Sequence, residues 1–271
     1  MLDLLQYEFV RRAFLAGTLL GIIAPLVGIF IVVRRLSGLG DTMAHVSLVG
    51  IAIALITKTN VLILTIISTV LAGLGIERLR NFQKAFSESI LVLFICSGLA
   101  ISTLLVSSFK GSVTSLTNYL FGSIVTISNW DVLATLVLAI IVIISVVILY
   151  NFFVNICFDE DLACAQGLKV KFLNYYLIVL AALVVAIGIQ VVGVLLISSL
   201  LVVPVLSAMQ FKASFRNTLL VSIALSVLSI WLGLFTSFYF DLASGPAIVV
   251  FNVLGFVLSL AISKFLTNSY T

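Results

Sequence analysis

An all-α, polytopic helical membrane protein is the fold class expected for this chain, because the sequence is strongly apolar, poor in charge and divided into long uncharged runs. Of its 271 residues, 63% are hydrophobic and 9% are charged, whereas about 25% of the residues in a soluble domain are charged. No low-complexity stretch and no block of like charge is present. We therefore expect residues 1–271 to form a single transmembrane domain that binds no nucleic acid.

Uncharged runs of about 20 residues mark the expected membrane spans, because a helix of that length crosses the hydrocarbon core. Single spans are expected at residues 13–33, 42–57, 60–76, 89–108, 132–158, 217–240 and 242–263. Residues 172–211 are uncharged throughout and too long for one span, so we expect a hairpin of two helices broken near residues 188–193. The total is nine spans, with eight as the alternative. Residues 111–130 are too polar for lipid contact and are expected to form a re-entrant element enclosed by protein.

The distribution of Lys and Arg between the loops predicts the orientation, because such residues stay on the cytoplasmic side. With nine spans, ten of the fourteen basic residues fall on one side and four on the other. We therefore expect a cell-membrane protein whose N terminus is outside and whose C terminus and 158–171 loop are cytoplasmic. An eight-span topology would change this assignment.

Asp41 and His45 are the first candidates for chemistry, because they stand four positions apart at the start of an apolar helix, a spacing that stacks both side chains on one face. A carboxylate and an imidazole suit divalent zinc or manganese. Two copies of the chain around a pore would supply two of each, enough for a tetrahedral ion. The structural alternative is that Asp41 caps the helix and His45 is a hydrogen-bonded interior residue. Because ionisable residues within spans are expensive to bury, both interpretations stay open.

Residues 159–167 predict a short cytoplasmic helix. Asp159 is its expected N-cap, Glu160 and Asp161 lie in its first turn, Ala163 lies within it and Gly167 follows its end. Most such connections are simply solvated, and the functional alternative is a docking element for a soluble partner. The residues alone favour the solvated connection.

Three further residues have weaker claims to a role. Glu88, at the inner end of the fourth span, is either a secondary acid of the pathway or an interfacial charge. Asp241 precedes the last helix, where a turn or capping role is favoured over metal binding. Pro204 follows small and hydroxyl residues that suit close helix packing or a kink.

The chain carries no motif for nucleotide hydrolysis, GxxxxGKS or GxxxxGKT. Its single histidine, His45, cannot by itself assemble a nucleophile with a base partner. We therefore expect that the chain is not an enzyme and that it depends on an outside source of energy.

The segment 30–50, which contains Arg34, Arg35, Asp41 and His45, resembles the signature of the permease subunits of ABC importers for zinc and manganese. Other segments resemble landmarks of that family in the expected order, at residues 118–123, 158–167, 193–204 and 240–245. The resemblance covers nearly the whole chain. It departs from the family in the last of these loops, where Ala243 and Pro246 stand in place of a proline before the Ser-Gly pair.

This resemblance implies a permease homodimer, with a fold related to cobalamin and siderophore importer permeases, whose pore passes Zn²⁺ or Mn²⁺ by alternating access. It implies cytoplasmic ATP-binding subunits and an extracytoplasmic metal-binding protein as partners, and no permanently bound cofactor. It implies that Asp41 and His45 are the metal-contacting pair and that residues 159–167 are the coupling helix, which binds in a groove on the ATPase. Because the imidazole must be neutral to bind metal, uptake is expected to fail at acidic pH.

Two other functions stay open. One is a gradient-driven secondary metal transporter that uses Asp41, His45 and Glu88 as proton carriers. The other is an ABC permease for cobalamin or siderophores, which the paired Asp and His argue against. Between the two metals we favour zinc on overall resemblance, although both ions accept Asp and His ligands.

Overall fold

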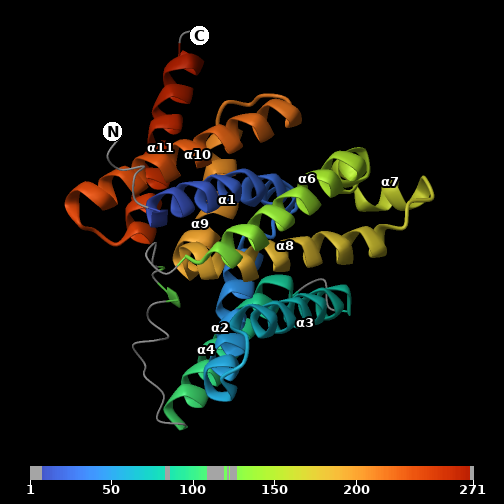
Figure 1. Cartoon of the computed structure of the whole chain (residues 1–271). Coiled ribbons are helices and arrows are strands. Elements are labelled where there is room, and N and C mark those ends of the chain that lie inside the picture. Colours follow the sequence, from blue (N-terminus) through green and yellow to red (C-terminus); the bar gives the residue numbers. More distant parts are fainter. Residues whose placement is uncertain (1–7, 83–85, 109–118, 121, 123–126, 269–271) are drawn as a thin grey trace.

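The computed structural model describes the chain except for residues 1–7, 83–85, 109–118, 121, 123–126 and 269–271. Within these limits the regular elements are α-helices (Figure 1), which confirms the expected all-α fold. In chain order they are α1 (Glu8–Val33), α2 (Gly38–Thr57), α3 (Val61–Phe82), α4 (Ser87–Ser108), α6 (Asn129–Phe158), α7 (Glu160–Ala165), α8 (Val170–Val192), α9 (Val194–Met209), α10 (Phe215–Phe240) and α11 (Ser244–Asn268). Most of the re-entrant element expected at residues 111–130 lies outside the described residues.

Eight of the described helices are long and apolar enough to cross a membrane. The apolar helix α9 is shorter, at 16 residues. At about 1.5 Å per residue, such a helix does not reach across a hydrocarbon core of about 30 Å when it stands alone. By helix length the structure therefore agrees with the eight-span alternative, and the ninth expected span corresponds to this short helix.

Gly193 separates α8 from α9 and confirms the break expected near residues 188–193. Its φ of 86° lies in a region that residues with a side chain seldom adopt. Just before the turn, Gly188 packs on α9, where an added Cβ would come within 2.5 Å of the Ile197 Cδ1 atom. Residues 172–211 therefore fold as two packed helices of unequal length.

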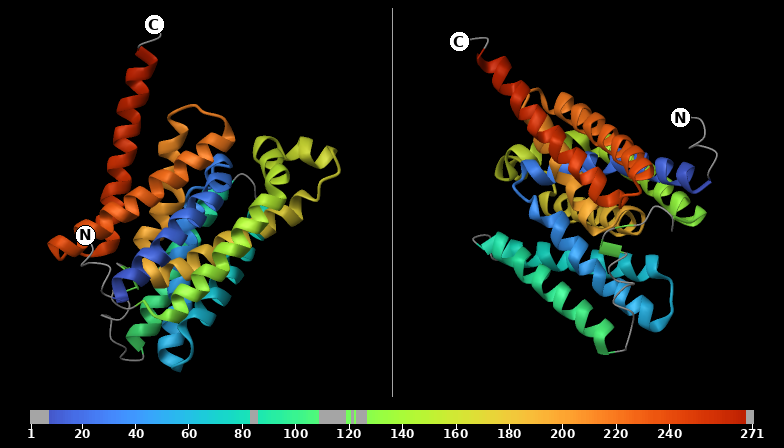
Figure 2. Two further views of the ribbon diagram at one scale, coloured as in Figure 1. Left: turned by 45° about the horizontal axis from the view of Figure 1, so that its top comes forward. Right: turned by 90° about the vertical axis from the view of Figure 1, so that its left-hand side faces the viewer.

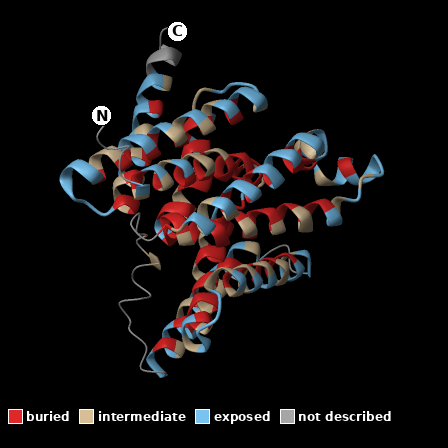
Figure 3. Ribbon diagram, viewed as in Figure 1, coloured by how far each residue is buried: buried red, intermediate tan, exposed pale blue. Residues whose placement is uncertain are grey.

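The core of the molecule is built from α1, α8 and α9 together with part of α2 (Figure 3). In the most hydrophobic stretch of α1, 78% of the residues are buried, against 22% in α4 and in α11. These two outer helices instead expose apolar side chains such as Leu93, Leu104, Leu254 and Val257. Faces of this kind suit contact with lipid tails or with another membrane chain.

The helices α2, α3 and α4 form one group, which lies below α1 and α8 in Figure 1 and at the bottom of the right-hand view in Figure 2. Close backbone contacts hold the group together. An added Cβ on Gly50 of α2 would lie 2.6 Å from the Leu64 carbonyl oxygen of α3, and one on Gly98 of α4 would lie 3.1 Å from the His45 carbonyl oxygen. The group packs on the rest of the chain through α8 and α9. The first turns of α2 lie at this junction.

Candidate metal pathway and coupling helix

A tight turn of four residues connects α1 to α2 and determines where α2 begins. Arg35 has a positive φ of 58°, and the backbone N–H of Leu36 donates to the Ile31 carbonyl at 3.0 Å. Leu36 is itself buried in the core. The turn therefore holds the start of α2 in a defined position, with Asp41 in its first turn.

Asp41 and His45 face each other on α2, as their spacing predicted. The His45 Nε2 atom lies 3.5 Å from the Asp41 Oδ1 atom. The Ser198 hydroxyl of α9 lies 3.4 Å from the same Oδ1 atom and 3.2 Å from the Val194 carbonyl oxygen, and it has one hydrogen to donate to either. Both contacts of the Asp41 carboxylate are loose, because a well-formed hydrogen bond between such atoms measures about 2.7–3.2 Å. A carboxylate, an imidazole and a hydroxyl thus converge without saturating one another.

The pair is partly open to its surroundings. The Asp41 side chain is 49% exposed and the His45 side chain 19%. The Nδ1 atom of His45 is buried and has no hydrogen-bond partner in the part of the chain that the structure describes. Because an unpaired buried polar atom costs about 1–3 kcal/mol, the structure does not show the satisfied interior histidine of the structural alternative.

Asp41 does not occupy the capping position that the same alternative gave it. The N-cap of α2 is Ser37, and Asp41 lies inside the first turn. The helix starts at Gly38, earlier than the uncharged run at 42–57 indicated, because Gly38 and Gly40 are accommodated within it. A carboxylate in a first turn is favoured by the helix dipole, yet its oxygens stay available to a ligand.

Among the described residues, no third His, Cys, Asp or Glu joins Asp41 and His45. Glu88 is exposed in the first turn of α4. Asp241 ends α10 with a φ of 54°, which is the turn position that its sequence context favoured. Pro204 is buried within α9. One chain therefore offers a partial set of donors and not the closed four-ligand cage of a structural zinc site.

The short helix expected at residues 159–167 is present as α7. Asp159 is its N-cap and accepts hydrogen bonds from the N–H groups of Asp161 and Leu162 at 2.9 and 3.0 Å. At the other end, the N–H of Gly167 donates to the Cys164 carbonyl at 3.0 Å. Gly167 has a φ of 84°, as expected for a glycine that follows a helix. Sequence and structure agree on the local shape of this element.

Among the residues of α7 that the sequence singled out, only Ala163 is buried, and apolar side chains are exposed beside the others. Leu162 is 61% exposed, and Phe158, just before the helix, is 75% exposed. Ala163 is buried at 1% exposure, so it supports α7 from beneath and does not form a docking surface. The buried side of α7 could not be predicted locally, because a helix of six residues is too short for its apolar pattern to define a face.

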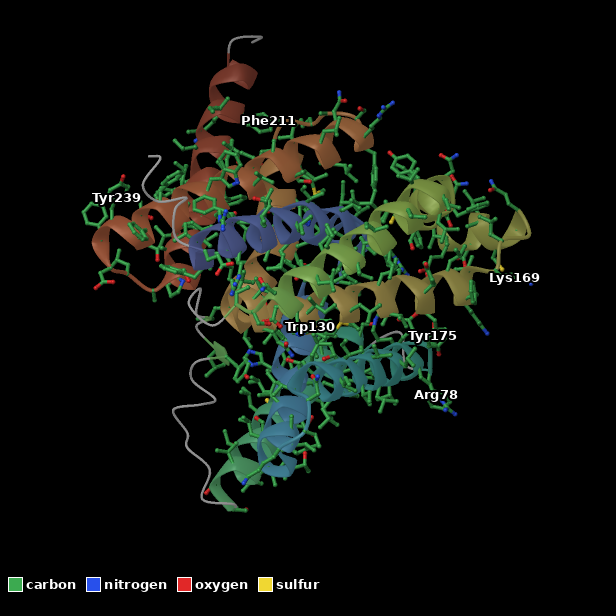
Figure 4. All side chains as sticks on the ribbon, viewed as in Figure 1. Arg78, Trp130, Lys169, Tyr175, Phe211 and Tyr239 are labelled. Carbon is green, nitrogen blue, oxygen red and sulfur yellow. The ribbon has the colours of Figure 1, made fainter. Side chains whose placement is uncertain are left out.

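Basic side chains lie at the end of the molecule where α7 protrudes (Figure 4). Arg78 and Lys169, two of the ten basic residues expected in the cytoplasm, both project at this end, whereas Tyr239 lies at the opposite end. The exposed α7 and these positive charges therefore share one face of the protein.

A polytopic helical chain that carries a donor pair within its membrane region and a short capped helix at one end has the make-up of a membrane permease. A family model agrees with this class, since residues 6–263 match the ABC 3 transport family. The chain belongs to that family. The resemblance found in the sequence is thereby confirmed at the level of the family.

Named relatives are metal transport proteins. The chain is 34% identical to the "Probable metal transport system membrane protein" of Treponema pallidum, over 96% of this chain and 98% of the relative. It is 32% identical to the manganese transport system membrane protein MntC of Listeria monocytogenes, over 91% and 88%. It is 29% identical to the high-affinity zinc uptake system membrane protein ZnuB of Haemophilus influenzae, over 94% and 98%.

A solved structure shares the fold over nearly the whole chain. The match is to a chain of PsaBC from Streptococcus pneumoniae in complex with Fab, with a TM-score of 0.84 and 30% identity. It covers 95% of this chain and 93% of that chain.

Proposed function

We propose that this chain is the membrane permease of an ATP-driven importer and that a divalent first-row metal, Zn²⁺ or Mn²⁺, passes between Asp41 and His45. Membership of the ABC 3 transport family supports the class of transporter. The observation that carries the pathway is the state of the pair, whose donor atoms converge at 3.5 Å, are partly exposed and have few other partners. Ionisable groups inside a membrane are costly to bury, so their presence there points to a functional role.

The small number of metal donors in one chain suits an ion that must be released as well as bound. One chain contributes the Asp41 carboxylate, the His45 imidazole and the Ser198 hydroxyl. In a homodimer with both pairs facing one pore, two carboxylates and two imidazoles would match the four ligands of a tetrahedral ion. Neither copy alone would hold the metal tightly, and a pathway must release its ion. Alternating access then opens the paired site to one side at a time.

In this proposal, partner proteins supply the energy for transport and deliver the metal ion. The helix α7 protrudes with Leu162 and Phe158 exposed, which suits a groove on a cytoplasmic ATP-binding subunit. ATP hydrolysis belongs to that subunit, and an extracytoplasmic metal-binding protein delivers the ion at the other end. The proposed orientation places the α7 end of the protein in the cytoplasm, which is supported by Arg78 and Lys169 at that end.

The choice between zinc and manganese is the finer part of the proposal. An imidazole favours Zn²⁺, whereas the two oxygen donors of Asp41 and Ser198 also suit Mn²⁺. Relatives are named for each metal. We keep zinc as the predicted ion and infer that the delivering protein makes the selection, because the donors of the pore accept both.

Accumulation of zinc and manganese in whole cells, measured by elemental mass spectrometry, tests the proposal. A strain that lacks this permease receives the native chain, Asp41→Ala, His45→Ala or Thr57→Ala, with membrane abundance matched by immunoblot. Thr57 is an exposed residue on the same helix and serves as the control. We expect the native chain and the control to restore one metal, and the other two variants to fail.

Each alternative function predicts a different result. Rescue by all four chains would mean that Asp41 and His45 are structural. No rescue of either metal by the native chain would favour a permease for cobalamin or siderophores. Rescue that persists after deletion of the ATP-binding subunit would favour a gradient-driven transporter.

A further inference from the structure

An ion pair with one buried member connects α7 to the turn before α2, because the Glu160 side chain is 41% exposed. Arg34 is the first residue of that turn, and its side chain is 8% exposed. Its Nη2 atom donates to the Oε1 atom of Glu160, in the first turn of α7. The Nδ2 atom of Asn174, on α8, donates to the same oxygen at 3.3 Å. One carboxylate oxygen thus joins the end of α1, α7 and α8.

A second ion pair from α3 lies within electrostatic range of the first. Arg80 and Glu77 are 2.9 Å apart, with side chains 15% and 3% exposed. Arg34 and Glu160 each interact electrostatically with both of these residues. Arg34, Glu77, Arg80, Glu160 and Asn174 are here called the inner charge cluster. Its two positive and two negative groups balance, and it joins α1, α3, α7 and α8.

The inner charge cluster has spare hydrogen-bonding capacity. The Nε atom of Arg80 and the Oδ1 atom of Asn174 are buried and have no partner among the described residues. A donor on Arg80 and an acceptor on Asn174 are therefore left for a further contact inside the cluster. Buried ion pairs seldom stabilise a protein more than apolar residues of similar size. Apolar residues would hold a fixed contact between helices equally well. Polar groups with unused donors and acceptors suit helices that move against one another.

The cluster also lies close in sequence to the metal-contacting pair. Arg34 is followed by three residues of the turn and then by α2, whose first turn carries Asp41. The turn is closed by the hydrogen bond from Leu36 to Ile31, so it is not a slack connection. A displacement of Arg34 is therefore passed to the start of α2.

We propose that the Arg34–Glu160 ion pair transmits the movement of α7 to the start of α2, and so to Asp41 and His45. Both members are positioning residues and neither is a metal ligand. This inference rests on the proposed function, because it takes α7 as the element that an ATP-binding subunit moves. Loss of the pair leaves ATP hydrolysis in place and separates it from metal movement.

The test uses neutral variants of the permease in its complete complex. Glu160→Gln keeps the size of the side chain and an oxygen acceptor but removes the charge. Arg34→Gln and the double variant complete a mutant cycle, and Arg34→Lys is the conservative variant that keeps the charge. Glu8→Gln is the matched control, because Glu8 pairs with Arg12 at 3.1 Å at the other end of α1 and is 69% exposed.

Two quantities are measured for each variant: metal uptake by cells, and ATP hydrolysis by the complex that copurifies with a tagged permease. For Glu160→Gln we expect unchanged copurification, continued ATP hydrolysis and a fall in metal uptake per ATP of about fivefold or more, the usual range for coupling between distant sites. The double variant loses no more than the single variants, because the two residues act as one unit. Arg34→Lys recovers part of the ratio, and Glu8→Gln matches the native chain.

Two results would overturn the inference. One is a native ratio of uptake to ATP hydrolysis in both Glu160→Gln and Arg34→Gln. The other is loss of the copurifying ATPase in proportion to uptake, which would make the pair a support for docking. A native chain that moves no metal would instead overturn the proposed function, so the two failures are distinguishable.

Discussion

The two polar clusters of this protein contain similar groups in opposite states. Around Asp41 the contacts measure 3.4–3.5 Å, and the carboxylate is half exposed. In the inner charge cluster Glu77 lies 2.9 Å from Arg80 and is nearly fully buried. Each charge there has an opposite charge beside it, whereas His45 has a buried nitrogen with no partner among the described residues. Under the proposed function, the difference teaches that donors for a passing ion are left unsaturated, while charges that join helices are paired.

This contrast predicts that substitutions in the two clusters fail in different ways. A change in the inner charge cluster leaves a buried charge without its partner, which lowers the stability of the folded state. A change at Asp41 or His45 removes a side chain that makes few close contacts in the folded state, so we expect it to change the stability little. Stability and uptake, measured side by side, therefore separate the two clusters.

Glu77→Leu is expected to lower the free energy of unfolding by about 3–5 kcal/mol, because it leaves Arg80 buried without its counter-charge. Thermal unfolding of the detergent-purified permease measures the change. An unfolding transition that matches the native one would show that the Glu77–Arg80 pair is not a stabilising contact of this fold.

Asp41→Asn is expected to lower metal uptake by at least about tenfold, the lower end of the loss when the surroundings of a metal ligand are altered. The side chain keeps its size and is half exposed, so the unfolding transition is expected to stay near the native one. Uptake is measured by elemental mass spectrometry at matched abundance. Native uptake together with an altered unfolding transition would contradict the comparison.

Ser198→Ala is expected to lower uptake about 2- to 10-fold, which corresponds to the 0.5–1.5 kcal/mol contributed by one hydrogen bond. The hydroxyl lies 3.4 Å from the Asp41 carboxylate and can donate to it when it leaves the Val194 carbonyl, which is 3.2 Å away. Ser207→Ala is the control on the same helix, because its hydroxyl bonds only to the Val203 carbonyl one turn earlier among the described contacts. Equal effects of the two variants would remove Ser198 from the site.

Glu8→Gln is expected to change the free energy of unfolding by no more than about 1 kcal/mol, because exposed ion pairs contribute little. Both pairs lie within one helix and have similar lengths, 3.1 Å for Glu8–Arg12 and 2.9 Å for Glu77–Arg80, but Glu8 is 69% exposed and Glu77 is 3% exposed. The same thermal unfolding assay measures it. A loss as large as that of Glu77→Leu would mean that burial does not explain the difference.

The helices could be predicted from the sequence because each depends on its own run of apolar residues. The same locality made the Asp41–His45 pair predictable, since its four-residue spacing lies within one helix. The contact of Ser198 with Asp41 spans 157 residues, and that of Arg34 with Glu160 spans 126. No local pattern encodes such partners, because they are determined by how the helices pack.

The length of α9 was missed for a related reason. The uncharged run 172–211 marks how much chain is apolar, but not where a turn divides it. The turn is at Gly193, near the middle of the run, and the second helix then ends at Met209. A hydropathy pattern therefore gives the amount of apolar chain more securely than the number of full crossings.

Gly98 brings α4 close to the helix that carries Asp41 and His45. Because this residue has no side chain, α4 lies against the backbone of His45. The opposite side of α4 carries Val92, Leu93 and Leu104, which are exposed to whatever surrounds the protein in the membrane. One helix diameter, about 10 Å, thus separates the surroundings of the protein from the α2 backbone at His45. A change in acyl-chain length or lipid order is therefore expected to reach α4 before it reaches His45.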